Sequence, residues 1–143
     1  MGRIVVGVDG SAGSRAALGW AVDEAHRRGD RVEAVMAWED LDVGMWTAAT
    51  SSHAEADALA DRHRRKLDEV VDSTPTSGLA GPVERLFVRG DPSQTLIDVA
   101  KGADLVVVGT RGHGSFVGTL LGSVSQRIAA HAPCPVVVVP RPH

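Results

Sequence analysis

The sequence predicts an α/β fold, an open five-stranded parallel sheet with helices on both faces. The main observation is that strand-like and helix-like segments alternate along the whole chain, which is typical of a parallel sheet with crossover helices. In addition, residues 105–108 and 136–139 are short, uninterrupted apolar runs, as expected for strands buried on both faces. The chain has 143 residues, 43% of them hydrophobic, and no internal repeat, so we expect residues 1–143 to form a single domain.

In the first half of the chain, hydrophobic periodicity separates two strands from two helices. A turn follows the first strand, and Ser11 or Ser14 within it can cap the next helix. Gly29 ends that helix, because glycine readily adopts the left-handed conformation of a helix C-terminus. The predicted elements are a strand at 4–8, a helix from the turn to Gly29, a strand at 31–38, a long loop at 40–52 and a helix at 54–71.

The second half of the chain continues the alternation. A helix is expected to begin at Asp91, which is a good cap and is followed by Pro92 in the first helical position. Ser123 and Gln126 have the spacing of a capping box, which predicts that Ser123 caps the last helix. The predicted elements are a strand at 83–89, the helix from Asp91, a strand at 105–108, a helix at 123–131 and a strand at 135–139.

The most informative segment is 109–125, a glycine-rich loop between a buried strand and a helix. Glycines let backbone N–H groups approach an anion closely, and a helix N-terminus adds unpaired donors and a positive dipole. The hydroxyl groups of Ser123 and Ser125 are expected to add two more donors. The segment therefore predicts a phosphate-binding site.

The position of this site depends on the order of the strands. Ligands of open α/β sheets bind beyond the carboxyl ends of the strands, where the strand order reverses. The orders 3-2-1-4-5 and 2-1-3-4-5 are both plausible for five strands. The first order is favoured, because it brings Asp9, at the end of the first strand, opposite the glycine-rich loop. Residues 36–38 would then be adjacent and form a wall for a base.

Two common phosphate-binding motifs do not match this chain. A Walker A loop requires a lysine, and the glycine-rich loop contains none. A dinucleotide motif requires glycines after the first strand, but there the chain has Asp9, whose carboxylate repels a pyrophosphate unless a metal ion intervenes. The phosphate-binding segment therefore belongs to another class.

Beyond these motifs, the chain resembles the universal stress protein family. The family's ATP-binding signature, G-x2-G-x9-G-[ST], is matched with correct spacing by Gly109, Gly112, Gly122 and Ser123. The resemblance covers the whole chain and includes I-V-V-G-V-D-G-S from Ile4, A-D-L-V-V-V-G before the loop, and A-P-C-P-V-V-V-V-P at 132–140. One departure is Met36, where many relatives have histidine, and it is expected to change the wall of the pocket rather than the phosphate site.

The resemblance implies an ATP-binding, adenine-nucleotide α-hydrolase-like fold and homodimers formed through the C-terminal strand. Asp9 would lie near the ribose or a metal-bridged phosphate, so Mg or Mn is a possible companion of the nucleotide. Ala37 would meet adenine through its backbone. The implied nucleotide-binding residues are Gly7, Val8, Asp9, Ala37, Val108, Gly109, Arg111, Gly112, His113, Gly114, Gly122, Ser123, Val124 and Ser125.

The function that follows from the resemblance is that of an ATP-binding universal stress protein, a regulatory nucleotide sensor or switch that acts as a homodimer in a stress response. Two alternatives remain. One is a slow ATPase or other adenine-nucleotide enzyme, against which the chain offers no recognisable catalytic motif, so at most weak ATP hydrolysis is expected. The other is a protein-binding dimer module with an AMP- or cAMP-type ligand.

The composition of the chain favours some partners and cellular locations over others. A net charge of −3 and a pI near 6.0 argue against nucleic acid as a partner. The apolar runs are too short to cross a membrane, no signal peptide is recognisable, and a single cysteine fits a reducing cytoplasm. We interpret Cys134 as a small buried apolar residue and the charged residues of the 54–71 helix as a solvated face.

Overall fold

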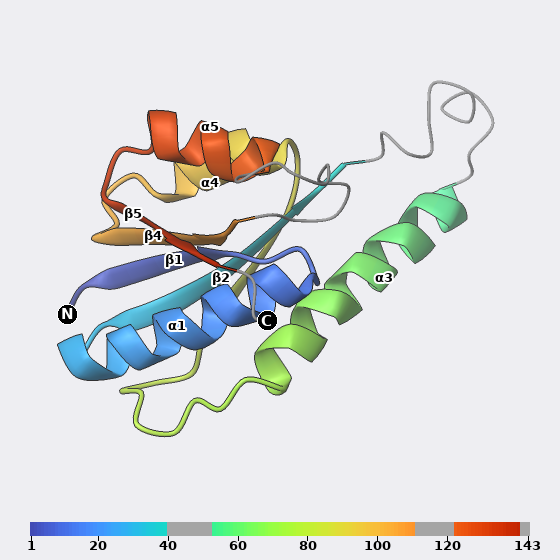
Figure 1. Cartoon of the computed structure of the whole chain (residues 1–143). Coiled ribbons are helices and arrows are strands. Elements are labelled where there is room, and N and C mark those ends of the chain that lie inside the picture. The colour runs from blue at the N-terminus through green and yellow to red at the C-terminus, as the bar shows by residue number, and fades with distance from the viewer. Residues whose placement is uncertain (40–52, 111–121, 141–143) are drawn as a thin grey trace.

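The computed structural model describes residues 1–39, 53–110 and 122–140. Five parallel strands form one sheet in the order β3-β2-β1-β4-β5, which confirms the favoured of the two predicted orders. Helices α1 and α3 cover one face of the sheet, and α4 and α5 cover the other (Figure 1). The strands are β1 (Arg3–Gly7), β2 (Arg31–Trp38), β3 (Glu84–Arg89), β4 (Leu105–Gly109) and β5 (Val136–Val139), and the helices are α1 (Ala12–Arg28), α3 (His53–Asp72), α4 (Pro92–Val99) and α5 (Ser123–His131).

Local sequence signals account for most of the helix boundaries. Ser11 is the N-cap of α1, and its hydroxyl oxygen accepts a hydrogen bond from the backbone N–H of Ser14. Gly29 ends this helix with a positive φ of 74°. The carboxylate of Asp91 accepts a hydrogen bond from the backbone N–H of Gln94 and so caps α4, as the sequence predicted. The predicted strand at 31–38 and helix at 123–131 match the observed bounds, and the other predicted elements differ from the observed ones by one or two residues at most.

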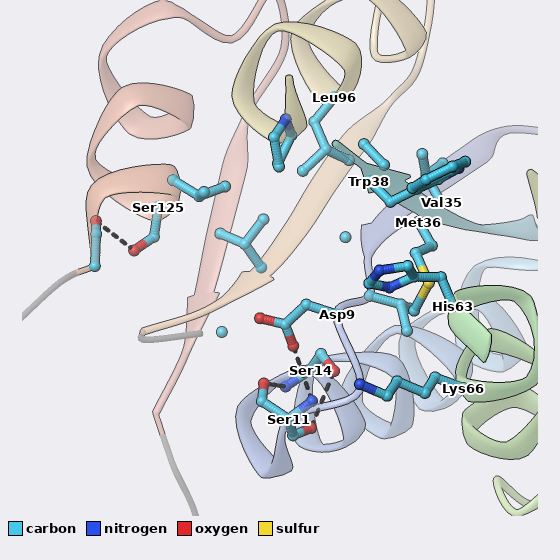
Figure 2. A pocket seen from close by; sticks show the side chains of 18 of the residues that line it. Asp9, Ser11, Ser14, Val35, Met36, Trp38, His63, Lys66, Leu96 and Ser125 are labelled. Atoms are coloured by element: carbon cyan, nitrogen blue, oxygen red, sulfur yellow. Dashed lines mark hydrogen bonds between the residues drawn. The ribbon is translucent and has the colours of Figure 1, made fainter. Parts of the chain in front are cut away.

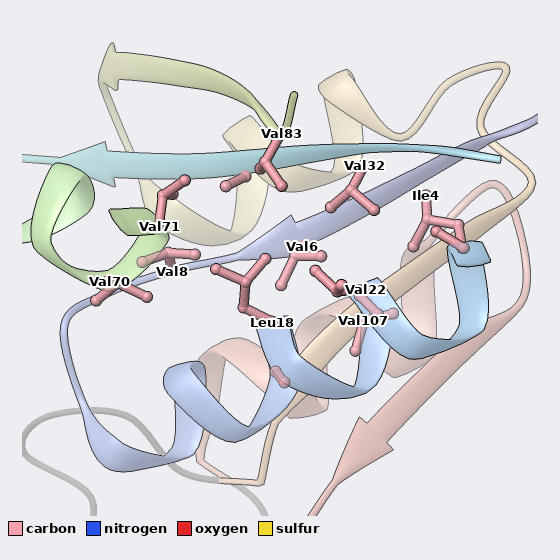
Figure 3. Packing of buried hydrophobic residues seen from close by; sticks show 14 of the residues in the cluster. Ile4, Val6, Val8, Leu18, Val22, Val32, Val70, Val71, Val83 and Val107 are labelled. Carbon is pink, nitrogen blue, oxygen red and sulfur yellow. The ribbon is translucent and has the colours of Figure 1, made fainter. Parts of the chain in front are cut away.

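The sheet is buried by two hydrophobic clusters, one on each face. The first lies between the sheet and the helices α1 and α3, where Val6, Leu18 and Val70 are completely buried (Figure 3). The second lies under α4 and α5 and contains Val5, Val106 and Ile128, which are also fully buried. Adjacent residues of β1 therefore contribute to opposite clusters, as expected for a strand covered on both faces.

The amino end of the sheet is closed by side chains that bind the backbone. Asp30 accepts a hydrogen bond from the N–H of Gly2, and Asp104 accepts one from the N–H of Arg3, both at 2.8 Å. The guanidinium group of Arg3 donates to the carbonyl oxygens of Val99 and Lys101, at the C-terminus of α4. These bonds satisfy backbone groups that the sheet and the helix leave unpaired. None of the described helices is both long and apolar enough to span a bilayer.

Candidate functional site

A cavity of about 400 Å³ lies at the carboxyl ends of β1, β2 and β4 (Figure 2). This is the place where the strand order reverses, at which ligands of open α/β sheets are expected to bind. Every predicted site residue that the structure describes lines this cavity. They are Gly7, Val8, Asp9, Ala37, Val108, Gly109, Gly122, Ser123, Val124 and Ser125, whereas Arg111, Gly112, His113 and Gly114 lie outside the described residues.

One wall of the cavity is the N-terminus of α5. The N-cap of this helix is Gly122 rather than Ser123, and within the described residues no side chain caps it. The predicted capping box is therefore wrong, because Ser123 already has the position of the first helical residue. Gly122 has no side chain to bind the N–H groups of the first turn, so this end of α5 retains the donors and the dipole that favour an anion.

Hydrogen bonds join the two ends of the glycine-rich segment. The N–H of Gly122 donates to the carbonyl oxygen of Thr110 at 2.6 Å. The hydroxyl of Ser125 lies 2.9 Å from the same oxygen and 3.1 Å from the carbonyl oxygen of Gly122, and it donates to these acceptors. Ser125 is buried, and its hydroxyl stabilises the neck of the glycine-rich segment, where Thr110 and Gly122 meet; Ser125 also lines the cavity.

The opposite wall begins at Asp9 and the first turn of α1. One carboxylate oxygen of Asp9 accepts a hydrogen bond from the N–H of Ser11 at 2.9 Å, and the side chain is exposed toward the cavity (Figure 2). The hydroxyl of Ser14 donates to the carbonyl oxygen of Ser11. Asp9 thus stabilises the turn between β1 and α1 and also lines the cavity.

Apolar side chains form the wall of the cavity along the end of β2, and Glu39, which follows this strand, also lines the cavity. Met36 and Trp38 are buried and line it together with Ala37, so residues 36–38 form the wall that the sequence predicted. The indole of Trp38 stacks against the His63 ring at 5.5 Å and the Phe87 ring at 5.8 Å between centroids. These contacts hold the indole in one orientation, because a buried aromatic ring packed between elements has little freedom to rotate.

Comparison with known proteins agrees with this geometry. The sequence model described as "Universal stress protein family" matches residues 1–140. The chain belongs to the universal stress protein family. A universal stress protein of Mycobacterium tuberculosis is 40% identical over 139 residues, which cover 94% of this chain and 44% of that protein. The chain therefore spans less than half the length of the curated universal stress proteins that it matches.

Solved universal stress proteins have the same fold. The universal stress protein UspA of Lactobacillus plantarum is 28% identical, with a TM-score of 0.71 over 96% of this chain and 97% of that one. A universal stress protein described in complex with cAMP is 25% identical, with a TM-score of 0.63 over 99% of this chain and 98% of that one.

The family resemblance did not reveal the part of the site that α3 contributes. His63 and Lys66 both line the cavity, although they lie on a helix far from the signature glycines (Figure 2). The charged residues of this helix had been interpreted as a solvated face, and Lys66 is an exception. A helical pattern can identify the residues that face the core, but it does not show that the helix extends beyond the core to the ligand site.

Within the described residues, the side chains at the cavity do not by themselves supply a complete site for a divalent metal ion. Among residues 1–39, 53–110 and 122–140, no three His, Cys, Asp or Glu side chains form a group that could hold a metal. Asp9 supplies a carboxylate at the cavity, and Mg²⁺ is commonly bound by one or two carboxylates with phosphate oxygens and water completing the coordination. The donor set is therefore compatible with a metal that is carried by a polyphosphate.

Proposed function

We propose that this universal stress protein binds an adenine nucleotide, ATP in the first place, and acts as a regulatory switch. The observation that carries the proposal is the convergence of separate chain segments on one cavity. Gly7, Ala37, Val108 and Ser123 come from four different parts of the sequence, and all of them line it. Its volume of about 400 Å³ falls within the usual range for small-molecule sites.

The chemistry of the walls suits the three parts of a nucleotide. The apolar end beside Met36 and Ala37 suits adenine, and the carboxylate of Asp9 is a suitable acceptor for ribose hydroxyl groups. The N-terminus of α5 suits phosphate. The solved relative in complex with cAMP supports the adenine-nucleotide class. With a triphosphate, Asp9 would help to hold Mg or Mn, whose positive charge would lower the repulsion between the carboxylate and the phosphates.

The proposal extends to the assembly and location of the protein. We expect residues 1–143 to act as one nucleotide-binding domain that forms a homodimer through β5. This strand is at the edge of the sheet, and Val136, Val137 and Val138 are only partly buried. An apolar edge strand is normally paired or covered. The single cysteine supports a reducing cytoplasm. A light-scattering mass of one chain would contradict the dimer.

The first experiment identifies the ligand. The purified protein is denatured, and the released small molecules are separated by HPLC. Calorimetric titrations with ATP, ADP, AMP and cAMP, each with and without Mg²⁺, then rank the nucleotides. Stoichiometric ATP in the extract, or tightest binding of ATP, supports the proposal. An empty extract and no binding of any nucleotide at millimolar concentration would refute it.

A charge variant tests the location of the site. Ser123 is exposed in the first turn of α5, where an acidic residue favours the helix dipole, so Ser123→Glu should fold normally. It should nevertheless weaken ATP binding at least about tenfold, because like charges placed together cost several kcal/mol. Ala129→Glu is the matched control, since Ala129 is exposed on the same helix and does not line the cavity. Equal affinities of the two variants would place ATP elsewhere.

A further inference from the structure

The third wall of the cavity, formed by α3, contains no residue of the ATP-binding signature. His63 and Lys66 are its contributions, one helical turn apart on the same face of the helix. We propose that Lys66 contacts the phosphate groups of the bound nucleotide and makes affinity depend on the charge of the ligand. This inference rests on the proposed function, since it names the side chain in that same site that selects a triphosphate over less charged nucleotides.

The backbone of Lys66 is fixed in position by the core. Leu67, the next residue, is 1% exposed, and Val70, one turn further along α3, is completely buried. Both belong to the cluster between the sheet and the helices α1 and α3. The side chain of Lys66 is itself exposed, and its amino group extends toward Asp9 and Ser11 (Figure 2). A rigid backbone with a long, mobile side chain can direct a positive charge to a ligand without disturbing the fold.

The neighbouring basic residues of α3 have other positions. Arg62 and Arg65 are exposed and do not line the cavity. The guanidinium group of Arg64 lies 5.7 Å from the centre of the Phe87 ring, and Arg64 does not line the cavity. Among the lining residues that the structure describes, Lys66 is the only lysine or arginine. The tertiary structure thus distinguishes Lys66 from three basic neighbours that the sequence does not separate from it.

The charge of the cavity explains why a cation is needed there. Asp9 and Glu39 both line it, and their carboxylates repel a phosphorylated ligand. The N-terminus of α5 offsets part of this repulsion at one wall. Lys66 is positioned to offset the repulsion at the wall formed by α3, where its amino group would form charge-assisted hydrogen bonds with phosphate oxygens. The benefit grows with the charge of the ligand, so it should be large for ATP, small for AMP and absent for adenosine.

The test compares Lys66→Gln with Arg65→Gln, a control that removes the same charge from the adjacent, outward-facing position. Calorimetry with adenosine, AMP and ATP gives the affinities, and thermal unfolding checks the fold. Lys66→Gln should weaken ATP about tenfold or more, the loss of one hydrogen bond to a charged group, and change adenosine by less than about twofold. Arg65→Gln should leave all three affinities within about twofold.

Each result has a defined meaning. An equal loss for adenosine and ATP, or no loss for ATP, would overturn the role of Lys66, while ATP binding by the unmodified protein would leave the proposed function intact. Failure of the unmodified protein to bind any nucleotide would instead refute the proposed function.

A double-mutant cycle separates contact with phosphate from neutralisation of Asp9. In the Asp9→Asn background, the loss of ATP affinity caused by Lys66→Gln should persist. If that loss disappears, Lys66 acts only by neutralising Asp9, and the proposed phosphate contact is wrong. Lys66→Arg, which retains the charge, should keep ATP affinity within about threefold.

Discussion

The two ends of the sheet differ in how side chains satisfy the nearby backbone groups. At the amino end, Asp30 and Asp104 accept hydrogen bonds from the backbone N–H groups of Gly2 and Arg3, and the Arg3 side chain binds two carbonyl oxygens at the end of α4. At the carboxyl end, by contrast, α5 begins at Gly122, which no described side chain caps, and a cavity of about 400 Å³ separates the elements.

This difference separates stability from ligand binding. Side chains that satisfy backbone groups stabilise the fold and leave no donors for a ligand. A helix N-terminus that no side chain caps keeps its donors and its dipole for an anion. Substitutions at the amino end should therefore change stability alone, and those at the carboxyl end should change binding. The predictions below test this division, in order of decreasing effect.

The largest effect is expected at Gly109, which packs closely against α1 and also lines the cavity. A Cβ atom there would lie 2.9 Å from the backbone carbon and oxygen of Gly13, so β4 and α1 would have to move apart. Gly109→Ala should lower the free energy of unfolding by about 2–3 kcal/mol, as overpacking does, and should weaken nucleotide binding because the cavity is distorted.

A second glycine supplies the control. Gly19 lies inside α1, and a Cβ atom added there would have no described atom within 4 Å apart from its chain neighbours and the backbone of its own helix. Gly19→Ala should therefore stabilise the protein by about 0.5–1 kcal/mol through helix propensity. Urea denaturation measures both variants. Similar stabilities of the two would show that the close approach of Gly109 to Gly13 is unimportant.

The next effect concerns the amino end alone. Arg3→Ala removes the ion pair with Glu33, which has an N–O distance of 3.3 Å, and the two hydrogen bonds to Val99 and Lys101. The unfolding free energy should fall by about 1–2 kcal/mol, because the carbonyl groups at the end of α4 lose their partner. ATP affinity, measured by calorimetry under conditions where the variant is folded, should stay within about twofold. A larger change in ATP affinity would contradict the idea that the amino end of the sheet affects stability alone.

A smaller effect is expected at the neck of the glycine-rich segment. Ser125→Ala removes the hydroxyl that binds the carbonyl oxygens of Thr110 and Gly122, with a cost of about 1 kcal/mol. Ser125→Thr keeps a hydroxyl and serves as the comparison. Because the neck sets the start of α5, the alanine variant should also bind ATP several times more weakly. Unchanged binding would indicate that the bond between Gly122 and Thr110 is sufficient.

The smallest effect is a pH dependence at Cys134, near the amino end. Burial raises the pKa of this thiol above its ordinary value, with Arg3 opposing and Asp104 adding to the shift. Below the ordinary thiol pKa, Cys134 is protonated in both the folded and the unfolded state, and the protonated thiol makes its full contribution to the unfolding free energy. As the pH rises, the unfolded chain loses the proton first, so the unfolding free energy falls.

Alkylation rates measure this shift. At about pH 8.5, iodoacetamide should modify Cys134 more slowly in the folded protein than in urea, since only the thiolate reacts. The pH at half-maximal reactivity should also be higher in the folded state. Equal profiles in the two states would contradict the effect of burial. ATP should not alter the rate, because Cys134 does not line the cavity.

Much of the fold could be predicted because its signals are local. Alternating apolar segments indicated a parallel sheet, and Ser11, Gly29 and Asp91 indicated helix boundaries within one or two residues. The strand order was also predicted, since only one of the two plausible orders brings Asp9 opposite the glycine-rich loop. The predicted cap at Ser123 was wrong because a glycine in extended conformation can occupy the N-cap position as well, and spacing alone does not choose between the two.

By itself, the sequence determined which segments become strands and helices and which residues gather at the carboxyl edge of the sheet, because periodicity, caps and glycine spacing act over a few residues. Only the tertiary structure decided the rest. It brings Gly109 against the backbone of Gly13 and lets the Arg3 side chain bind the end of α4. It also places Lys66 at the cavity, beside residues that lie far from it in the chain. Such contacts depend on how complete elements pack together, and no local pattern specifies that packing.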